Sequence, residues 1–215
     1  MNDDGVGAVT DFAVRGDGQA VAALGALALS GAIVGRTAAS QPLAAAIDEY
    51  GGRIPLPYGH GHCWVTRTGA GPVAGMLYLT PPIRWLEGHP PALRPRLSRA
   101  VAEIELLAVE PAHRRRGTGS ALLQAAENAA LSDGVQLMLA KVRIGALPLM
   151  RWYRRRGYLL AGQGEPIVFA TQGGMSSCDD GGDGYQLAVK ALQPGVTVRR
   201  TSSRGTTLLV AQRDA

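Results

Sequence analysis

The stretch between residues 102 and 120, AEIELLAVEPAHRRRGTGS, constrains the fold more than any other part of this chain. An apolar strand pattern with two glutamates leads into Pro111, then into arginines and glycines, and then into an alanine- and leucine-rich helix. Amides at a helix start lack intrahelical partners, and the helix dipole adds positive character there. Because glycines let a phosphate approach the backbone, this order predicts an anion site at a strand–turn–helix junction.

Two widespread phosphate motifs do not fit this junction. A dinucleotide fingerprint needs G-x-G-x-x-G, but after Gly117 and Gly119 the third position holds Leu122. A Walker loop needs a lysine, which this segment lacks. Residues 114–119, RRRGTG, instead fit the pattern Gln/Arg-x-x-Gly-x-Gly/Ala, and the segment resembles the acetyl-CoA loop of the GNAT acetyltransferase superfamily.

A second resemblance lies downstream of a buried strand pattern. The segment from Tyr153 to Tyr158, YRRRGY, is similar to the Tyr-x-x-x-Gly-aromatic segment of the same family. There the tyrosine hydroxyl lies beside the coenzyme sulfur and protonates the departing thiolate, so the resemblance assigns Tyr153 as the acid. One position departs from the family pattern, because Ala146 stands where members often carry asparagine.

The resemblance also implies a binding set for acetyl-CoA. Backbone amides from Arg115 to Ser120 would hold the diphosphate, the arginines of the loop would add charge, and the preceding strand edge would pair with the pantetheine amides. The predicted cofactor-binding residues are Leu107, Ala108, Val109, Arg114, Arg115, Arg116, Gly117, Thr118, Gly119 and Ser120.

Two glutamates on the strand are candidates for the base that deprotonates an acceptor amine. Glu103 and Glu105 share one face of a strand because side chains alternate. Glu103 stands fourteen residues before Gly117, which resembles the place of the base in histone-type GNAT members. A solvated strand end, a pair with an arginine, or a water chain acting as base are the alternatives.

The order of elements predicts an α/β (α+β) fold: a single GNAT-like domain with a mixed, mostly antiparallel central sheet flanked by helices. We expect the domain over 1–192, with its core at 9–192, a mobile loop at 171–184, and a C-terminal extension at 193–215 that forms an extra hairpin at 196–212. The expected strands are 9–15, 62–68, 72–79, 101–109, 135–142, 158–161 with an extension to 167–170, and 185–192. The expected helices are 18–32, 41–50, 119–131 and 146–156, and residues 81–99 are expected to form a loop.

These features together predict an acetyl-CoA-dependent N-acetyltransferase acting on a primary amine, in a small molecule rather than a protein. The alternatives are a catalytically silent acyl-CoA-binding module, or an enzyme that uses another acyl-CoA, an acyl-tRNA or a carrier protein. A net charge of +5 and a pI near 9.6 favour anionic partners, but almost all the basic residues are arginines, which indicates genomic bias rather than nucleic-acid binding.

Further expectations concern metal, membrane and compartment. Neither the stretch Tyr58 to Cys63 with its two histidines nor the aspartates at 179–183 has the spacing of a metal site, so we expect no metal. The uncharged run 20–35 is too short to span a bilayer. Two distant cysteines, Cys63 and Cys178, indicate free thiols in a cytoplasmic protein. The apolar hairpin expected in the C-terminal tail is compatible with a homodimer.

Overall fold

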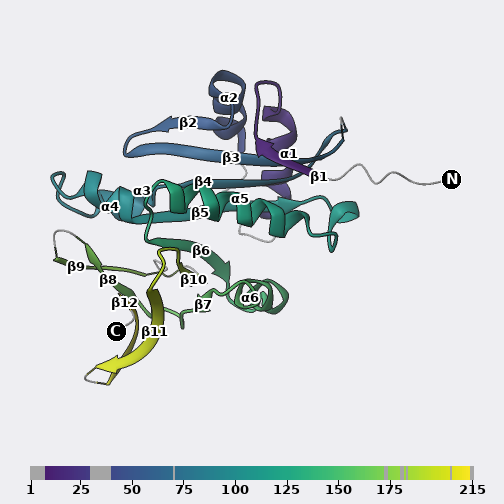
Figure 1. Cartoon of the computed structure of the whole chain (residues 1–215). Coiled ribbons are helices and arrows are strands. Elements are labelled where there is room, and N and C mark those ends of the chain that lie inside the picture. Colours follow the sequence, from purple (N-terminus) through teal and green to yellow (C-terminus); the bar gives the residue numbers. More distant parts are fainter. Residues whose placement is uncertain are drawn as a thin grey trace. The chain divides into compact units, whose positions relative to one another are not determined.

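The computed structural model describes residues 8–29, 40–69, 71–171, 174–179, 182, 184–203 and 205–213. The chain forms two compact units, and Figure 1 labels their helices and strands. The first unit comprises Met1–Thr80 and Glu105–Ala129, and the second comprises Pro81–Ile104 and Ala130–Ala215. No helix in the described ranges has the length and apolar character needed to cross a bilayer.

The first unit is built on strand β3, which pairs antiparallel with β1, β2 and β4. Its elements are β1 (Ala8–Phe12), α1 (Gly18–Leu29), α2 (Ser40–Tyr50), β2 (Arg53–Leu56), β3 (Gly59–Thr68), β4 (Val73–Thr80), the end of β5 (Val101–Val109), the 3₁₀ turn η2 (Pro111–His113) and most of α5 (Thr118–Ser132). The helix predicted at 18–32 is confirmed as far as Leu29, and its last three residues lie outside the described residues. Strand β2 was not predicted.

Alternation along the strands sets the core of this unit. Cys63 and Val65 of β3 point to the same face as Met76 of β4, and all three are fully buried. They pack against apolar residues of α1 and α2, including Val21 and Ile47. Both helices therefore cover one face of the sheet. The apolar side chains that recur at helical spacing form the face of each helix that packs on it.

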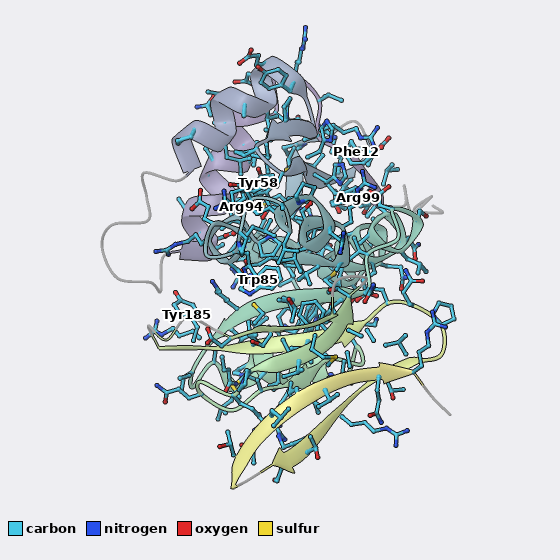
Figure 2. All side chains as sticks on the ribbon, turned by 90° about the vertical axis from the view of Figure 1, so that its left-hand side faces the viewer. Phe12, Tyr58, Trp85, Arg94, Arg99 and Tyr185 are labelled. Atoms are coloured by element: carbon cyan, nitrogen blue, oxygen red, sulfur yellow. The ribbon has the colours of Figure 1, made fainter. Side chains whose placement is uncertain are left out.

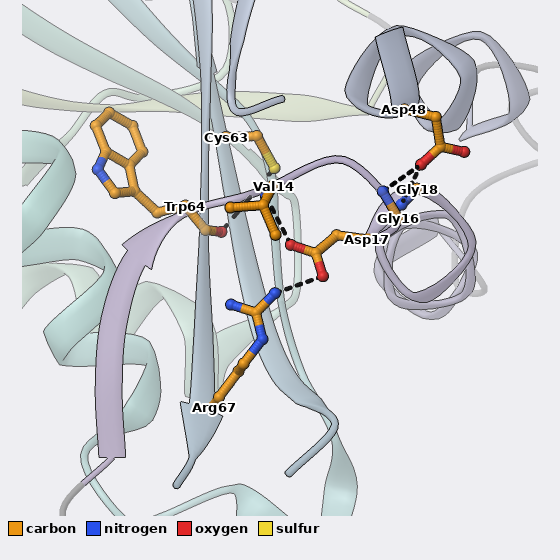
Figure 3. Close-up of polar contacts among 8 residues, drawn as sticks. All are labelled: Val14, Gly16, Asp17, Gly18, Asp48, Cys63, Trp64 and Arg67. Atoms are coloured by element: carbon orange, nitrogen blue, oxygen red, sulfur yellow. Dashed lines mark hydrogen bonds and ion pairs between the residues drawn. The ribbon is translucent and has the colours of Figure 1, made fainter. Parts of the chain in front are cut away.

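The carboxylates of Asp17 and Asp48 form hydrogen bonds around the start of α1 (Figure 3). The carboxylate of Asp17 accepts the N–H of Val14 at 2.8 Å and forms an ion pair with Arg67 of β3. Asp48 of α2 accepts the N–H groups of Gly16 and Gly18, both at 3.1 Å. The bond to Gly18 satisfies an amide that the helix leaves unpaired, and the bonds to Val14 and Gly16 hold the segment that leads into it, so together they fix where α1 begins.

The second unit contains two sheets. Its elements are α3 (Ile83–Glu87), α4 (Arg94–Ala100), the start of β5, β6 (Leu137–Arg143), α6 (Leu147–Arg154), β7 (Leu159–Leu160), β8 (Ile167–Thr171), β9 (Gly174–Cys178), β10 (Tyr185–Ala191), β11 (Val196–Ser203) and β12 (Thr206–Arg213). In one sheet β5 pairs parallel with β6, and β10 pairs antiparallel with both β6 and β7. The other has the order β11-β12-β8-β9. The predicted mixed, mostly antiparallel sheet with flanking helices is confirmed, and the small sheet is an addition to it.

Residues 81–99 were predicted to form a loop, and this prediction was wrong. They contain α3 and α4, which bury Leu86 and Leu97. Trp85, labelled in Figure 2, donates its indole N–H to the carbonyl of Ser177 at 2.8 Å and lies 6.0 Å from the ring of Phe169. The prolines of this segment favoured the prediction of a loop. However, Pro95 lies at the start of α4, where proline is compatible with a helix.

The segment after β7 also differs from the prediction. Strand β8 does not extend β7 in the central sheet but pairs with β9 and, in parallel, with β12. Strand β9 lies inside the stretch 171–184 that was predicted to be a mobile loop. Ile167 and Phe169 of β8 are buried with Leu209 of β12 in one cluster, which supplies the apolar area that keeps this segment ordered.

The predicted C-terminal hairpin is present as β11 and β12. Arg200 of β11 donates to both carboxylate oxygens of Glu165 at 2.8 Å and to the carbonyl of Leu160 at 2.7 Å. Gly162 adds a third hydrogen bond to the Glu165 carboxylate at 2.5 Å. The hairpin is therefore tied to the loop between β7 and β8 by a forked arginine–carboxylate pair.

Candidate active site

The turn before α5, called here the anion loop (Arg114–Gly119), has the geometry of an anion nest. Arg115, although not glycine, has φ 59°, and Gly117 has φ 87°. Within the described part of the chain, the N–H groups of residues 115–119 have no hydrogen-bond partner. Successive amides turned outward by left-handed residues bind anions, and the helix dipole of α5 adds to this effect. The N–H of Ser120, by contrast, donates to the carbonyl of Gly117 at 2.8 Å.

Two side chains of the anion loop itself hold its backbone in place. Arg114 donates its Nε–H to the carbonyl of Val109 at 2.9 Å, and the hydroxyl of the buried Thr118 contacts the carbonyl of His113 at 3.3 Å. A Cβ on Gly75 of β4 would lie 3.1 Å from the side chains of both Thr118 and Leu122. Glycine at position 75 thus lets the start of α5 approach β4. The Val109 carbonyl, on the strand edge predicted to pair with pantetheine, thus accepts a hydrogen bond from Arg114.

The residues of the anion loop fit a diphosphate. A Cβ built on Gly117 would meet nothing within 4 Å, so the space over this residue is open. The side chains of Arg115 and Arg116 are exposed, and in the described ranges neither forms an ion pair. Free amides, open space and uncommitted positive charge are the features that a diphosphate requires.

Glu103 is buried in the second unit, with 7% of its surface exposed. Its carboxylate lies 3.3 Å from the ammonium of Lys141, which is two residues beyond its register partner Leu139 on β6. From the sequence we considered an ion pair of Glu103 with an arginine; in the structure its partner is Lys141. The ion pair with the half-buried Lys141 compensates the burial of the Glu103 carboxylate, and a base at this position would have to act from within that pair.

Glu105, the second candidate base, belongs to the first unit and is exposed. Its negative charge contributes to the raised pKa of Tyr78, which reaches about 12 because of burial first, then Cys63, then Glu105. A Cβ on Gly61 of β3 would collide with the phenol of Tyr78. Sequence reasoning did not identify Tyr78. Its register partner on β3 is Cys63, and Gly61, two residues before Cys63, leaves room for its ring.

Tyr153 lies on α6 and is buried, with 3% of its surface exposed. Its ring meets the ring of Trp152 edge-on at 4.9 Å and that of Tyr158 at 5.0 Å. Tyr158 in turn donates its hydroxyl to the sulfur of Met138 on β6 at 3.1 Å. The structure thus places Tyr153 in an aromatic cluster rather than on the solvated face of the arginine-rich helix. Ala146, at the start of α6, offers no side-chain cap.

The two candidate catalytic residues of the second unit lie toward opposite faces of the β5–β6 pair. Register places Glu103 on the face of Leu139 and Lys141. Met138 points to the other face, and its contact with Tyr158 puts the aromatic cluster of Tyr153 there. The strand pattern predicted which face of the strand Glu103 occupies. It did not predict the burial of Glu103 or its ion pair with Lys141. The only sign of that pair in the sequence is a lone lysine in an apolar strand.

The histidine-rich segment at the start of β3 is an aromatic row. The rings of Phe12, His62 and Trp64 stack or meet edge-on at 5.1–5.8 Å. Burial, followed by the charge of Asp17, raises the pKa of Cys63 to about 12, which disfavours the thiolate that metals prefer. Across the described ranges, no group of three or more His, Cys, Asp or Glu residues could hold a metal ion.

Solved structures share this fold at low sequence identity. The structure of yncA from Salmonella typhimurium with its cofactor acetyl-CoA matches with a TM-score of 0.57 and 18% identity, over 92% of this chain and 99% of that one. An N-acetyltransferase from Staphylococcus aureus Mu50 matches with a TM-score of 0.57 and 14% identity, over 87% and 99%. N-acetylglutamate synthase from Neisseria gonorrhoeae, complexed with coenzyme A and N-acetyl-glutamate, matches with a TM-score of 0.55 and 18% identity, over 87% and 35%.

Family membership follows from the sequence itself. No curated protein matches the chain. The model of the acetyltransferase (GNAT) family, however, matches residues 40–158, which is more than half of the 215 residues. This range contains the anion loop, Glu103 and Tyr153. The chain belongs to the GNAT family of acetyltransferases.

Proposed function

We propose that this protein transfers the acetyl group of acetyl-CoA to a primary amine of a small molecule. The observation that carries the proposal is the anion loop: five successive amides without partners, under an open glycine, at the start of a helix. Such a loop suits the diphosphate of a coenzyme and needs no metal to neutralise it.

The binding roles divide between backbone and side chain. The amides of Arg115 to Gly119 would hold the diphosphate, and the guanidinium groups of Arg115 and Arg116 would add charge at its edge. Leu107 and Ala108, on the strand before the loop, are the remaining candidates for contact with pantetheine. Val109 and Ser120 have backbone groups already engaged and are weaker candidates.

The chemistry needs two proton transfers. Bound acetyl-CoA would supply an activated thioester. Glu103, directly or through a water molecule, would accept a proton from the acceptor amine as its nitrogen forms a C–N bond to the acetyl carbon. Tyr153 would donate its hydroxyl proton to sulfur as the C–S bond breaks and would regain a proton from solvent. Glu105 remains an alternative base. The products are an acetamide and the free thiol of coenzyme A.

One observation favours a silent acyl-CoA-binding module as the second candidate function. The Glu103 carboxylate is already paired with Lys141, and it lies on the face opposite to the Tyr153 cluster. The same module could carry another acyl group. We propose that the protein is cytoplasmic, and the two free cysteines support this proposal.

Turnover and binding measurements separate these functions. Thiol release from acetyl-CoA, measured across a panel of small amines, should occur with at least one of them. Glu103→Gln and Tyr153→Phe should each lower kcat by about 100-fold and leave the KM for acetyl-CoA unchanged. The exposed residues Glu87 and Tyr50 provide the matched controls Glu87→Gln and Tyr50→Phe. Calorimetric binding of acetyl-CoA without thiol release for any amine would establish the silent module instead.

A further inference from the structure

The second unit contains a pocket of about 450 Å³ that none of the proposed cofactor residues lines. Its polar lining comes from Arg96 and Arg99 of α4, Gln136 before β6 and Thr171 at the end of β8. Gly134 and small apolar residues of α4 and its approach complete the wall. A volume of this size falls at the lower end of the range for small-molecule sites, about 300–1,000 Å³.

The charge of this arginine pocket is uncompensated. Its lining contains no carboxylate. Neither the guanidinium of Arg96 nor that of Arg99 has a hydrogen bond or ion pair to any residue in the described ranges. The two residues are three positions apart on one helix, so their side chains are neighbours, and like charges at this spacing destabilise the helix. An anion between them would remove that repulsion.

The frame around the two arginines is fixed by the fold. Leu97 and Ala100 anchor the inner face of α4 in the core, with 3% and 5% exposure. The N–H of Gln136 donates to the carbonyl of Ala100 at 2.9 Å, and its own carbonyl accepts the N–H of Leu192 at 2.9 Å. The backbone of Gln136 is thus held on both sides, and Gln136 is the third polar residue of the lining beside the two arginines. Figure 2 labels Arg99 on α4.

We propose that the arginine pocket binds a small phosphate ester. A phosphate monoester carries nearly two negative charges at neutral pH and three acceptor oxygens, so one group can neutralise both arginines and accept forked hydrogen bonds from each. A single carboxylate carries one charge and two oxygens. The volume leaves room for a small organic group beside the phosphate, against the apolar wall.

Residue-level binding can be measured by two-dimensional NMR on the full chain. We expect the amide signals of Gly134 and Gln136 to shift saturably with glycerol 3-phosphate and not with glycerol. Arg96→Gln combined with Arg99→Gln should weaken this binding at least about tenfold, which corresponds to about 1.4 kcal/mol. The matched control combines Arg84→Gln with Arg213→Gln, two exposed arginines outside the pocket, and should change the affinity less than twofold.

Several outcomes would overturn the proposal. They are the absence of a saturable shift at Gly134, an equal loss of affinity in the control variant, or tighter binding of succinate than of glycerol 3-phosphate. A third variant, Gly117→Val in the anion loop, should leave these shifts intact. The proposed acetyl-CoA site can therefore fail without affecting this result, and the reverse also holds. The spectrum of each variant also reports whether it has folded.

Discussion

The anion loop of the first unit and Arg200 of the second unit use the same amino acid in opposite ways. In the loop, Arg115 and Arg116 present backbone amides, and their side chains have no partner within the described residues. Arg200 instead acts through its side chain, whose fork holds the buried Glu165 carboxylate. A site formed by backbone depends on conformation, whereas a site formed by a side chain depends on that side chain's identity. Substitutions should therefore separate the two regions.

The largest effect should follow from a change in the conformation of the loop. Gly117→Val places a branched side chain at φ 87°, where a residue other than glycine costs about 1–2 kcal/mol, and fills the open space over the amides. We expect acetyl-CoA affinity to fall about 100-fold in calorimetry. Gly195→Val is the matched control, because Gly195 also has a positive φ, 71°, and open surroundings. Equal losses in both variants would show that the effect is general destabilisation.

A smaller but clear effect should follow from removing the charge of Glu165. The hydrogen bonds from Arg200 lower the pKa of Glu165, burial opposes them, and the amide of Gly162 assists. Glu165→Gln should lower the free energy of unfolding by about 2 kcal/mol at pH 7. This estimate lies toward the lower end of the range for charged hydrogen bonds, since the side chain of Arg200 is 45% exposed and solvent screens the pair.

The same pair predicts how stability depends on pH. Because the pKa of Glu165 is lower in the folded chain, its stabilisation is complete above the unfolded value of about 4.3 and is lost as the pH falls through the folded value. Urea unfolding from pH 7 to pH 3 should show a steeper loss for the wild type than for Glu165→Gln. Parallel curves would mean that the fork contributes nothing.

The ion pair of the first unit should have an intermediate effect on stability. Asp17→Asn removes the charge that faces Arg67 but retains an oxygen that can accept the N–H of Val14. The side chains of Arg67 and Asp17 are 25% and 11% exposed, so we expect the free energy of unfolding, measured in urea, to fall by about 1 kcal/mol. Asp133→Asn, at an exposed position, serves as control and should change the stability by less than about 0.5 kcal/mol. A loss no larger than that of the control would contradict a stabilising role for the pair.

Local sequence patterns predicted the first of the two compared regions well. Strand β5 has the predicted limits, 101 and 109, and α5 differs from its predicted limits by one residue at each end. Both depend on local features: apolar alternation, a glycine turn and a helix of alanine and leucine. The same features predicted the anion loop, because amides at a helix start are free whatever the distant contacts are.

The second region depended on distant contacts, which no local pattern contains. Leu209 of β12 lies in parallel register with Ile167 of β8, and these positions are far apart in the chain. The helices α3 and α4 are too short to show a hydrophobic period. The ion pair of Glu103 with Lys141 also arises only when two strands are placed in register. The candidate catalytic side chains were therefore proposed from the family resemblance, whereas their surroundings were not predicted.

The smallest effect should come from conservative changes in the loop, and it is the sharpest test of the comparison. Arg115→Lys and Arg116→Lys keep a positive charge and the backbone amides, so acetyl-CoA affinity should change less than about threefold, or 0.7 kcal/mol. Arg200→Lys makes the same chemical change but removes the second donor of the fork, and should cost about 1 kcal/mol of unfolding free energy. If the loop variants lose tenfold or more, their guanidinium groups bind the phosphates directly. The loop would then be, like Arg200, a site formed by side chains.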